Sequence, residues 1–145
     1  MLSQLTPVCP PQLLHKAQAL PVMTTAVVNA GSELALESVK LAFEAGIIMP
    51  ILVGDIAAIH KAAQAIGWPI DQFELIASNG EEDAAAKAVQ CVHQGSAQLL
   101  MKGNLHTDVL IRALLNKQHG LRTGERLSHL FHMSVPDSDR VLCIT

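Results

Sequence analysis

The sequence predicts a three-layer α/β domain, in which helices flank both faces of a mostly parallel sheet. Apolar runs of strand length alternate with longer stretches of helical period, as in successive βαβ units. Gly, Pro or Asn marks most of the changes between them. Half of the 145 residues are hydrophobic and 16% are charged, which allows one sizeable core and excludes a disordered chain.

The expected domain occupies residues 24–145, after a leading segment at residues 1–23. Its first strand is Thr24–Ala30, which is β-branched and apolar enough to be buried. Gly31 and Ser32 open a helix with Ser32 as its N-cap, and this helix ends at Gly46. Its predicted inward face carries Leu36, Val39 and Phe43.

The next two strands and helices repeat the alternation. A strand over Ile48–Val53 leads through Gly54 and Asp55 into a helix over Ile56–Ile66, and the third strand is Phe73–Ala77. Asn79, with Glu82 three residues later, is a capping pattern for a helix that runs to about His93. The apolar stripe of that helix consists of Ala85, Ala88, Val89 and Val92.

The last third of the chain continues the pattern. The fourth strand is Ala97–Met101, and a helix over Asp108–Asn116 follows it, capped by Thr107 or Asn104. Its expected inward residues are Leu110, Ile111, Leu114 and Leu115. Beyond it we expect a loop at 120–124 (GLRTG), a fifth strand at Leu127–Val135, a turn at Pro136–Asp139 and a sixth strand beginning at Val141–Thr145. A buried-looking strand at the very end is unusual, so this Rossmann-like domain is expected to be truncated at its C-terminus.

Charge and composition exclude several classes of function. A net charge of −3, no Tyr and only one Trp argue against a nucleic-acid or anionic-membrane surface. No apolar run is long enough to span a bilayer, and the N-terminus lacks the pattern of a secretory signal, which predicts a cytoplasmic protein. Three widely spaced cysteines fit neither a disulfide framework nor a zinc site.

The carboxyl ends of parallel strands are where such sheets bind ligands. Four loops qualify: 29–32, 54–55, 78–80 and 102–107. The last is the richest, because Lys102 supplies a cation, Gly103 allows close approach to the backbone, and Asn104, His106 and Thr107 add donors at a helix start. This loop is a candidate anion cradle, although Lys-Gly is also ordinary turn chemistry.

The charge distribution favours an anionic ligand in the same region. Residues 102–126 carry five Lys or Arg side chains and two carboxylates, a net charge of +3 within an acidic chain. Arg122, followed by Thr123, lies between the two glycines of GLRTG and can bind a phosphate through two donors at once. Arg112 and Lys117 fit a solvated helix face. Neither GxxxxGK[ST] nor GxGxxG occurs, which disfavours those two kinds of nucleotide site.

The histidines do not predict a metal or nucleophile site. His129 and His132 are three residues apart on an expected strand, which would point them to opposite faces. Ser128 precedes His129, but neighbouring strand residues do not converge as a nucleophile and its base must. Asp108 is close enough in sequence to orient His106, or it can serve as a partner of the helix dipole.

The segment LLMKGNLHTDVLIRALLNKQHGLRTGERLSHLFHMSVP, residues 99–136, resembles the phosphate acetyl/butyryltransferase family. Members carry a strand ending in MKG, a helix, a GLRTG-like loop and an LSHVF-like strand in that order. ILVGD at 51–55 and VLCIT at 141–145 also look like family segments, so the resemblance extends over about residues 24–145. Lys102-Gly103 follows the butyryltransferase branch, where the acetyltransferases have Ser-Gly, and leans toward four-carbon acyl groups.

The resemblance implies an isopropylmalate dehydrogenase-like α/β enzyme that transfers an acyl group between coenzyme A and inorganic phosphate. Both are substrates, and no metal or redox cofactor is implied. The expected phosphate- and CoA-binding residues are Lys102, Gly103, Asn104, Thr107, Arg122 and Thr123. Family members are about twice as long and carry their usual catalytic residues in the later half. This chain alone is therefore expected to be inactive, as a fragment that forms homo-oligomers or is complemented by the missing half. The alternative is a non-catalytic module that binds an anion or CoA.

Overall fold

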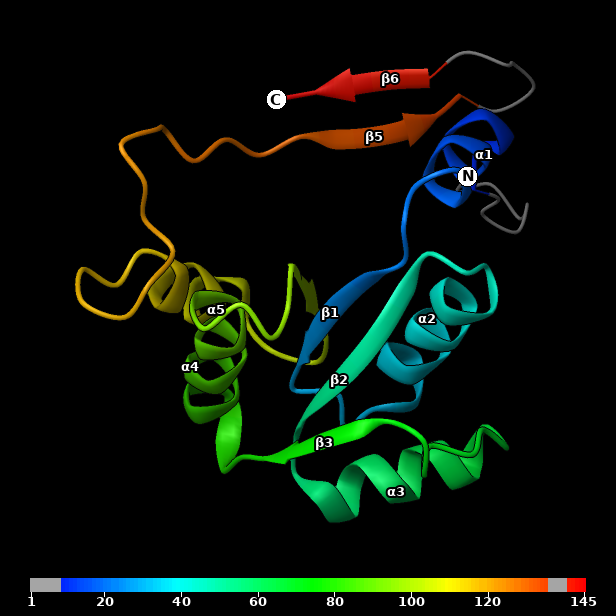
Figure 1. Cartoon of the computed structure of the whole chain (residues 1–145), viewed down its shortest axis with the longest axis vertical. Helices are drawn as coiled ribbons and strands as arrows, with labels where there is room; N and C mark the ends of the chain where they lie inside the picture. The colour runs from blue at the N-terminus through cyan, green and yellow to red at the C-terminus, as the bar shows by residue number, and fades with distance from the viewer. Residues whose placement is uncertain (1–8, 136–140) are drawn as a thin grey trace, which may run out of the picture.

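The computed structural model describes residues 9–135 and 141–145 and contains helices and strands in alternation (Figure 1). In chain order they are α1 (Pro11–Gln18), β1 (Met23–Val28), α2 (Glu33–Glu44), β2 (Ile48–Gly54), α3 (Ile56–Ala65), β3 (Glu74–Ala77), α4 (Gly80–His93), β4 (Leu99–Lys102), α5 (Thr107–Leu114), β5 (Phe131–Ser134) and β6 (Val141–Ile144). No helix in the described ranges is long and apolar enough to cross a membrane.

Strands β1 to β4 form one parallel sheet in the order β3-β2-β1-β4, which confirms the predicted fold class. Val28, the last residue of β1, pairs with Val53 on one side and with Lys102 on the other. The chain therefore moves outward from β1 to β3 and then returns to the opposite side of β1. β1 is the strand at which the order reverses.

One face of the sheet is covered by α2 and α3. Their fully buried side chains Leu36, Val39 and Ile59 pack against Val27 and Leu52, which point to this face from alternate positions of β1 and β2. Three aromatic rings, of Phe43, Trp68 and Phe73, extend the cluster with ring centroids 4.9–6.2 Å apart. The predicted inward face of α2 is confirmed, with Phe43 partly buried.

The other face is covered by α4 and α5. The buried alanines of α4, Ala84, Ala85 and Ala88, have small side chains that let the helix approach Val28 and Val53 closely. Leu110 of α5 joins this cluster, and Ile111 and Leu114 are partly buried. The prediction for Leu115 is wrong: the residue is 43% exposed, because it follows the last residue of the helix and lines an open pocket with Leu121 and Leu127 instead of joining the core.

Helix capping agrees with the sequence fully for α2 and, in the position of the N-cap alone, for α4. The Ser32 side chain accepts the Ala35 N–H at 3.3 Å, as predicted. Asn79 occupies the N-cap position of α4 without a side-chain bond, and it is Asp83, not Glu82, that accepts the Asn79 N–H at 2.9 Å. His106 occupies the N-cap position of α5, so the expected caps Thr107 and Asn104 are both wrong.

Helix α1 lies in the leading segment and is not predicted from the sequence. Pro11 is its first residue, where a proline costs no hydrogen bond. The helix has no buried residue, and the Gln18 side chain donates to the carbonyl oxygen of Ala45, after α2. It is therefore a surface helix, in which only Leu14 and Ala17 are partly buried.

Strands β5 and β6 pair antiparallel in a separate two-stranded sheet, which we call the β5–β6 ribbon. β5 spans Phe131–Ser134, shorter than the predicted strand at Leu127–Val135. His129 therefore precedes the strand. Its ring lies beside that of Phe131, with centroids 4.3 Å apart, and Phe131 and His132 point to opposite faces of β5, which agrees with the expected separation of the two histidines. No group of three or more His, Cys, Asp or Glu side chains within the described residues can hold a metal ion. The turn predicted at Pro136–Asp139 lies outside those residues.

Candidate functional site

The carboxyl ends of β1 and β4 lie side by side at the point where the strand order reverses. After β1 the chain continues into α2 on one face of the sheet, and after β4 it continues into α5 on the other face. Ligands of open α/β sheets bind at such a reversal point, between loops that diverge. The two loops are residues 29–32 and 102–107, and we call this part of the molecule the β1–β4 edge.

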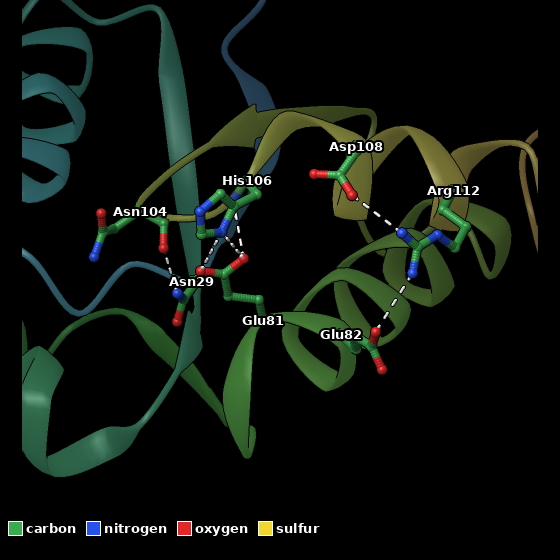
Figure 2. A network of polar contacts seen from close by, with 7 residues as sticks. All are labelled: Asn29, Glu81, Glu82, Asn104, His106, Asp108 and Arg112. Atoms are coloured by element: carbon green, nitrogen blue, oxygen red, sulfur yellow. Dashed lines mark hydrogen bonds and ion pairs between the residues drawn. The ribbon is translucent and has the colours of Figure 1, made fainter.

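Backbone hydrogen bonds join the two loops directly. The N–H of Gly103 donates to the carbonyl oxygen of Val28 at 2.9 Å, and the N–H of Asn104 donates to that of Asn29 at 3.0 Å. The Asn29 side chain returns a hydrogen bond from Nδ2 to the carbonyl oxygen of Asn104 (Figure 2). Asn29 has a φ of 55°, a left-handed conformation that few residues other than glycine adopt and that is enriched at functional sites.

Gly103 is required by the neighbouring strand. A Cβ atom at this position would lie 2.4 Å from the carbonyl oxygen of Val28 and 2.7 Å from that of Asn29. Only a residue without a side chain lets β4 come this close to β1. The sequence predicts that Gly103 lets a ligand approach the backbone closely. In the structure, the backbone of β1 fills that space.

Glu81, in the first turn of α4, holds the start of α5. Its carboxylate accepts the backbone N–H of His106 at 2.9 Å and also contacts His106 Nδ1, at 2.9 Å from Oε2 and 3.1 Å from Oε1 (Figure 2). Hydrogen bonds from the His106 backbone and ring lower the pKa of Glu81. In return, the hydrogen bond and charge of Glu81 raise the pKa of His106. The sequence left two roles open for Asp108, as the group that orients His106 or as a partner of the helix dipole; in the structure Glu81 orients His106.

Lys102 is the last residue of β4, and its side chain is exposed at this edge. Its positive charge is a minor influence on the pair: it adds to the lowering of the Glu81 pKa by His106 and opposes the rise of the His106 pKa caused by Glu81. Asn104 and Thr107 are also exposed. The structure thus brings four of the six predicted site residues to the β1–β4 edge, namely Lys102, Gly103, Asn104 and Thr107.

Arg112 joins α4 to α5 and is not directed at the edge. Its guanidinium donates to Asp108 at 3.0 Å and to Glu82 at 3.5 Å (Figure 2). All three side chains are two-thirds or more exposed. This agrees with the interpretation of Arg112 as part of a solvated surface.

Arg122 and Thr123 lie beyond the other end of α5. Their loop is closed by hydrogen bonds from Leu121 N–H to Leu114 and from Gly120 N–H to Asn116. This loop lines a pocket of about 480 Å³, to which four leucines and both Arg122 and Arg126 contribute. Thr123 Oγ1 accepts the Glu125 N–H at 3.2 Å. Among the described residues, no hydrogen bond or ion pair links this loop to Lys102.

Sequence reasoning missed the specific roles of Asn29, Glu81 and His106. A weak signal exists for Asn29, because Asn shortly before Gly at the end of a strand often adopts a left-handed conformation. No local signal pairs Glu81 with His106, because they are 25 residues apart and meet only when α4 and α5 pack together.

Comparison with known proteins places these observations in a family. No family model matches the chain. It is 37% identical over 134 residues to a phosphate butyryltransferase from Clostridium beijerinckii, covering 92% of this chain and 44% of that protein. It is also 37% identical over 134 residues to a phosphate acetyltransferase from Rhizobium meliloti, covering 42% of that protein.

Solved structures agree on the fold. A branched-chain phosphotransacylase from Enterococcus faecalis aligns with a TM-score of 0.61 at 21% identity, over 84% of this chain and 42% of that one. A phosphotransacetylase from Staphylococcus aureus aligns with a TM-score of 0.63 at 18% identity, over 90% and 49% respectively. The chain belongs to the phosphate acetyl- and butyryltransferase family and spans less than half the length of the relatives it matches.

Proposed function

We propose that this chain provides the phosphate- and CoA-binding part of an enzyme that transfers an acyl group between coenzyme A and inorganic phosphate. The observation that carries the proposal is its 37% identity, over 92% of the chain, to a phosphate butyryltransferase. The β1–β4 edge supports it, because a cationic loop at a reversal point suits a small anion.

The reaction makes specific demands on the site. An oxygen of phosphate attacks the thioester carbonyl carbon, a carbon–oxygen bond forms, the carbon–sulfur bond breaks, and the CoA thiolate leaves and takes up a proton. Phosphate must be held and partly neutralised, and the oxyanion on the carbonyl must be stabilised by donors. No metal ion or redox cofactor is needed for this chemistry.

The hydrogen-bond donors of loop 102–107 fall into two groups, those that bond to β1 and those that can bind phosphate. The N–H groups of Gly103 and Asn104 already donate to β1, so they position the loop. Phosphate is bound by the Lys102 ammonium, the Asn104 side-chain amide and the Thr107 hydroxyl, all exposed at this edge.

Arg122 and Thr123 bind a second anionic group. Eight residues of α5 span about 12 Å and separate their loop from Lys102. One phosphate is too small to contact both loops, but coenzyme A carries several phosphates on an extended molecule. We therefore assign Arg122 and Thr123, beside the leucine-lined pocket, to a phosphate of CoA.

The catalytic groups are expected in the part of the relatives' length that these 145 residues do not span. The preference for four-carbon acyl groups, homo-oligomer formation and a cytoplasmic location are part of the same proposal. A second candidate is a non-catalytic module that binds an anion or CoA. It is favoured by the four-stranded core, whose two faces are both covered within this chain.

Calorimetric titration of the 145-residue chain with inorganic phosphate and with CoA tests the proposal. We expect saturable binding of both, and weaker phosphate binding by Lys102→Gln than by the control Lys117→Gln, which removes the same charge from an exposed position outside the edge. Phosphate-dependent release of CoA from acyl-CoA should be negligible for the chain alone and should appear when the remaining length of a relative is added. Binding without turnover in that mixture would favour the non-catalytic module. Equal losses in both variants, or no saturable binding, would contradict the proposed site.

A further inference from the structure

Glu81 and His106 form a pair at the β1–β4 edge. Neither residue is among the groups assigned above to phosphate. Glu81 comes from α4, whereas His106 directly precedes α5. One carboxylate contacts both the backbone N–H and the ring nitrogen Nδ1 of the same residue. This arrangement fixes the position of the loop and the orientation of the imidazole together.

The contact also determines which ring nitrogen carries a proton. A carboxylate only accepts hydrogen bonds, so Nδ1 must be the N–H donor toward Glu81. The other nitrogen, Nε2, points away from Glu81 (Figure 2), and the His106 side chain is 80% exposed. Nε2 is therefore the atom that can meet a ligand.

Three charged groups act on the ring. Glu81 faces it from α4, Lys102 from β4 and Asp108 from α5, while Arg112 is held by Asp108 and Glu82. Glu81 is the strongest influence, through its hydrogen bond and charge, and it raises the pKa of His106 against the opposing effect of Lys102. The pair thereby favours an imidazolium close to the Lys102 ammonium.

We propose that His106 binds the substrate phosphate through Nε2–H, and that Glu81 is a positioning residue that acts on phosphate through His106. This inference rests on the proposed function, because it assigns a further ligand contact to the same edge. Its consequence is that anion binding is linked to a proton on His106. Affinity should fall as the pH rises through the pKa of that residue.

Replacing Glu81 separates this role from simple charge repulsion. The Glu81 carboxylate itself repels an anion, so if it had no other role, Glu81→Gln would strengthen binding at every pH. If it acts through His106, the substitution lowers the pKa of the imidazole. The variant then binds the anion as well as or better than the parent chain at low pH, and more weakly at high pH. This reversal with pH marks a positioning role.

Sulfate is the suitable probe, because it has the shape of phosphate and keeps its charge from about pH 5 to 8, where histidine titrates. Its affinity for the 145-residue chain would be measured across this range, and the His106 ring titrated by NMR with and without sulfate. We expect sulfate to raise the pKa of His106, by the reciprocity of linked binding. At constant pH, sulfate should leave the ring resonances of the exposed His60 on α3 unshifted. His106→Gln should remove the pH dependence attributable to this site.

Glu81→Gln should move the midpoint of the sulfate-binding curve to lower pH. Well above that midpoint, the variant should bind sulfate about tenfold more weakly than the parent chain for each unit by which the substitution lowers the pKa of His106. Glu82→Gln is the matched control. Glu82 follows Glu81 in α4 and carries the same charge, but it pairs with Arg112 and not with His106.

Two results would contradict the inference in distinguishable ways. If sulfate binds with no dependence on the protonation of His106, the role of the pair is refuted while the anion site stands. If neither sulfate nor phosphate binds saturably, the proposed function of this edge fails as well. His106→Gln keeps both outcomes readable even if Glu81→Gln does not fold, because the His106 side chain is largely exposed.

Discussion

Replacing Gly103 by alanine should loosen the contact between β1 and β4. The added Cβ would lie 2.4 Å from the carbonyl oxygen of Val28, whereas real Cβ contacts begin at 3.0–3.4 Å. The two strand ends must therefore separate by about 0.6–1.0 Å to accept one methyl group. Because the obstacle is backbone on a central strand, no side-chain rotation can relieve it.

The free-energy cost of this displacement comes from the backbone hydrogen bonds that join the ends of β1 and β4. Moving β4 outward by this amount lengthens the bonds from Gly103 and Asn104 to β1, which are now 2.9 Å and 3.0 Å, to or beyond the usual limit. Overpacking of this kind typically costs about 1–3 kcal/mol. For a chain of this length we expect the melting temperature to fall by about 3–10 °C.

Thermal unfolding followed by circular dichroism measures the effect, with Gly124→Ala as the control. Gly124 has no atom within 4 Å of an added Cβ, so its substitution should leave the melting temperature unchanged or slightly raised. A Gly103→Ala variant as stable as the parent would refute the explanation by close packing. Loss of phosphate binding without loss of stability would instead favour ligand approach as the reason for this glycine.

Three further predictions concern acid stability, the second anion-binding loop and self-association. Hydrogen bonds from Lys87 and from the Asn79 N–H lower the pKa of Asp83, so its contribution to stability is present above the unfolded-state pKa and is lost as the pH falls through the folded one. Urea unfolding at a series of acidic pH values should give a flatter profile for Asp83→Asn than for Asp71→Asn, and parallel profiles would contradict this. Arg122→Lys should weaken CoA binding on the order of tenfold, because a single ammonium cannot replace a two-pronged donor, while Lys117→Ala should change it little; equal losses would indicate only a general effect of charge. One face of the β5–β6 ribbon carries Phe131, Met133, Leu142 and Ile144, each half or more exposed, so sedimentation velocity should show concentration-dependent association that Met133→Glu reduces. A monomer at all concentrations would count against it.

The elements of the four-stranded sheet could be predicted because their signals are local. Ser32 caps α2 through its own neighbours, and the alternation in β1 and β2 directs Val27 and Val28 to opposite faces whatever the partner strands are. The features that could not be predicted depend on contacts between segments far apart in the sequence. The β5–β6 ribbon could not be distinguished from an extension of the parallel sheet, because an apolar run does not specify the strand with which it pairs.

The candidate site shows the same division. Lys102, Asn104 and Thr107 follow one strand directly, so their common location could be predicted once that strand was recognised. The pairing of Glu81 with His106 depends on how α4 packs beside α5, and the reason for Gly103 depends on the register between β1 and β4. Long-range packing therefore decided which residues act together.

The most direct test of the β1–β4 edge as the phosphate site is a phosphate titration of the isotope-labelled 145-residue chain, followed residue by residue by NMR. Saturable shifts should concentrate at residues 29–32 and 102–107, with the His106 ring among the most strongly affected. CoA should add shifts at residues 121–127. Unsaturable shifts, or saturable shifts that avoid both loops of the edge, would contradict the central claim.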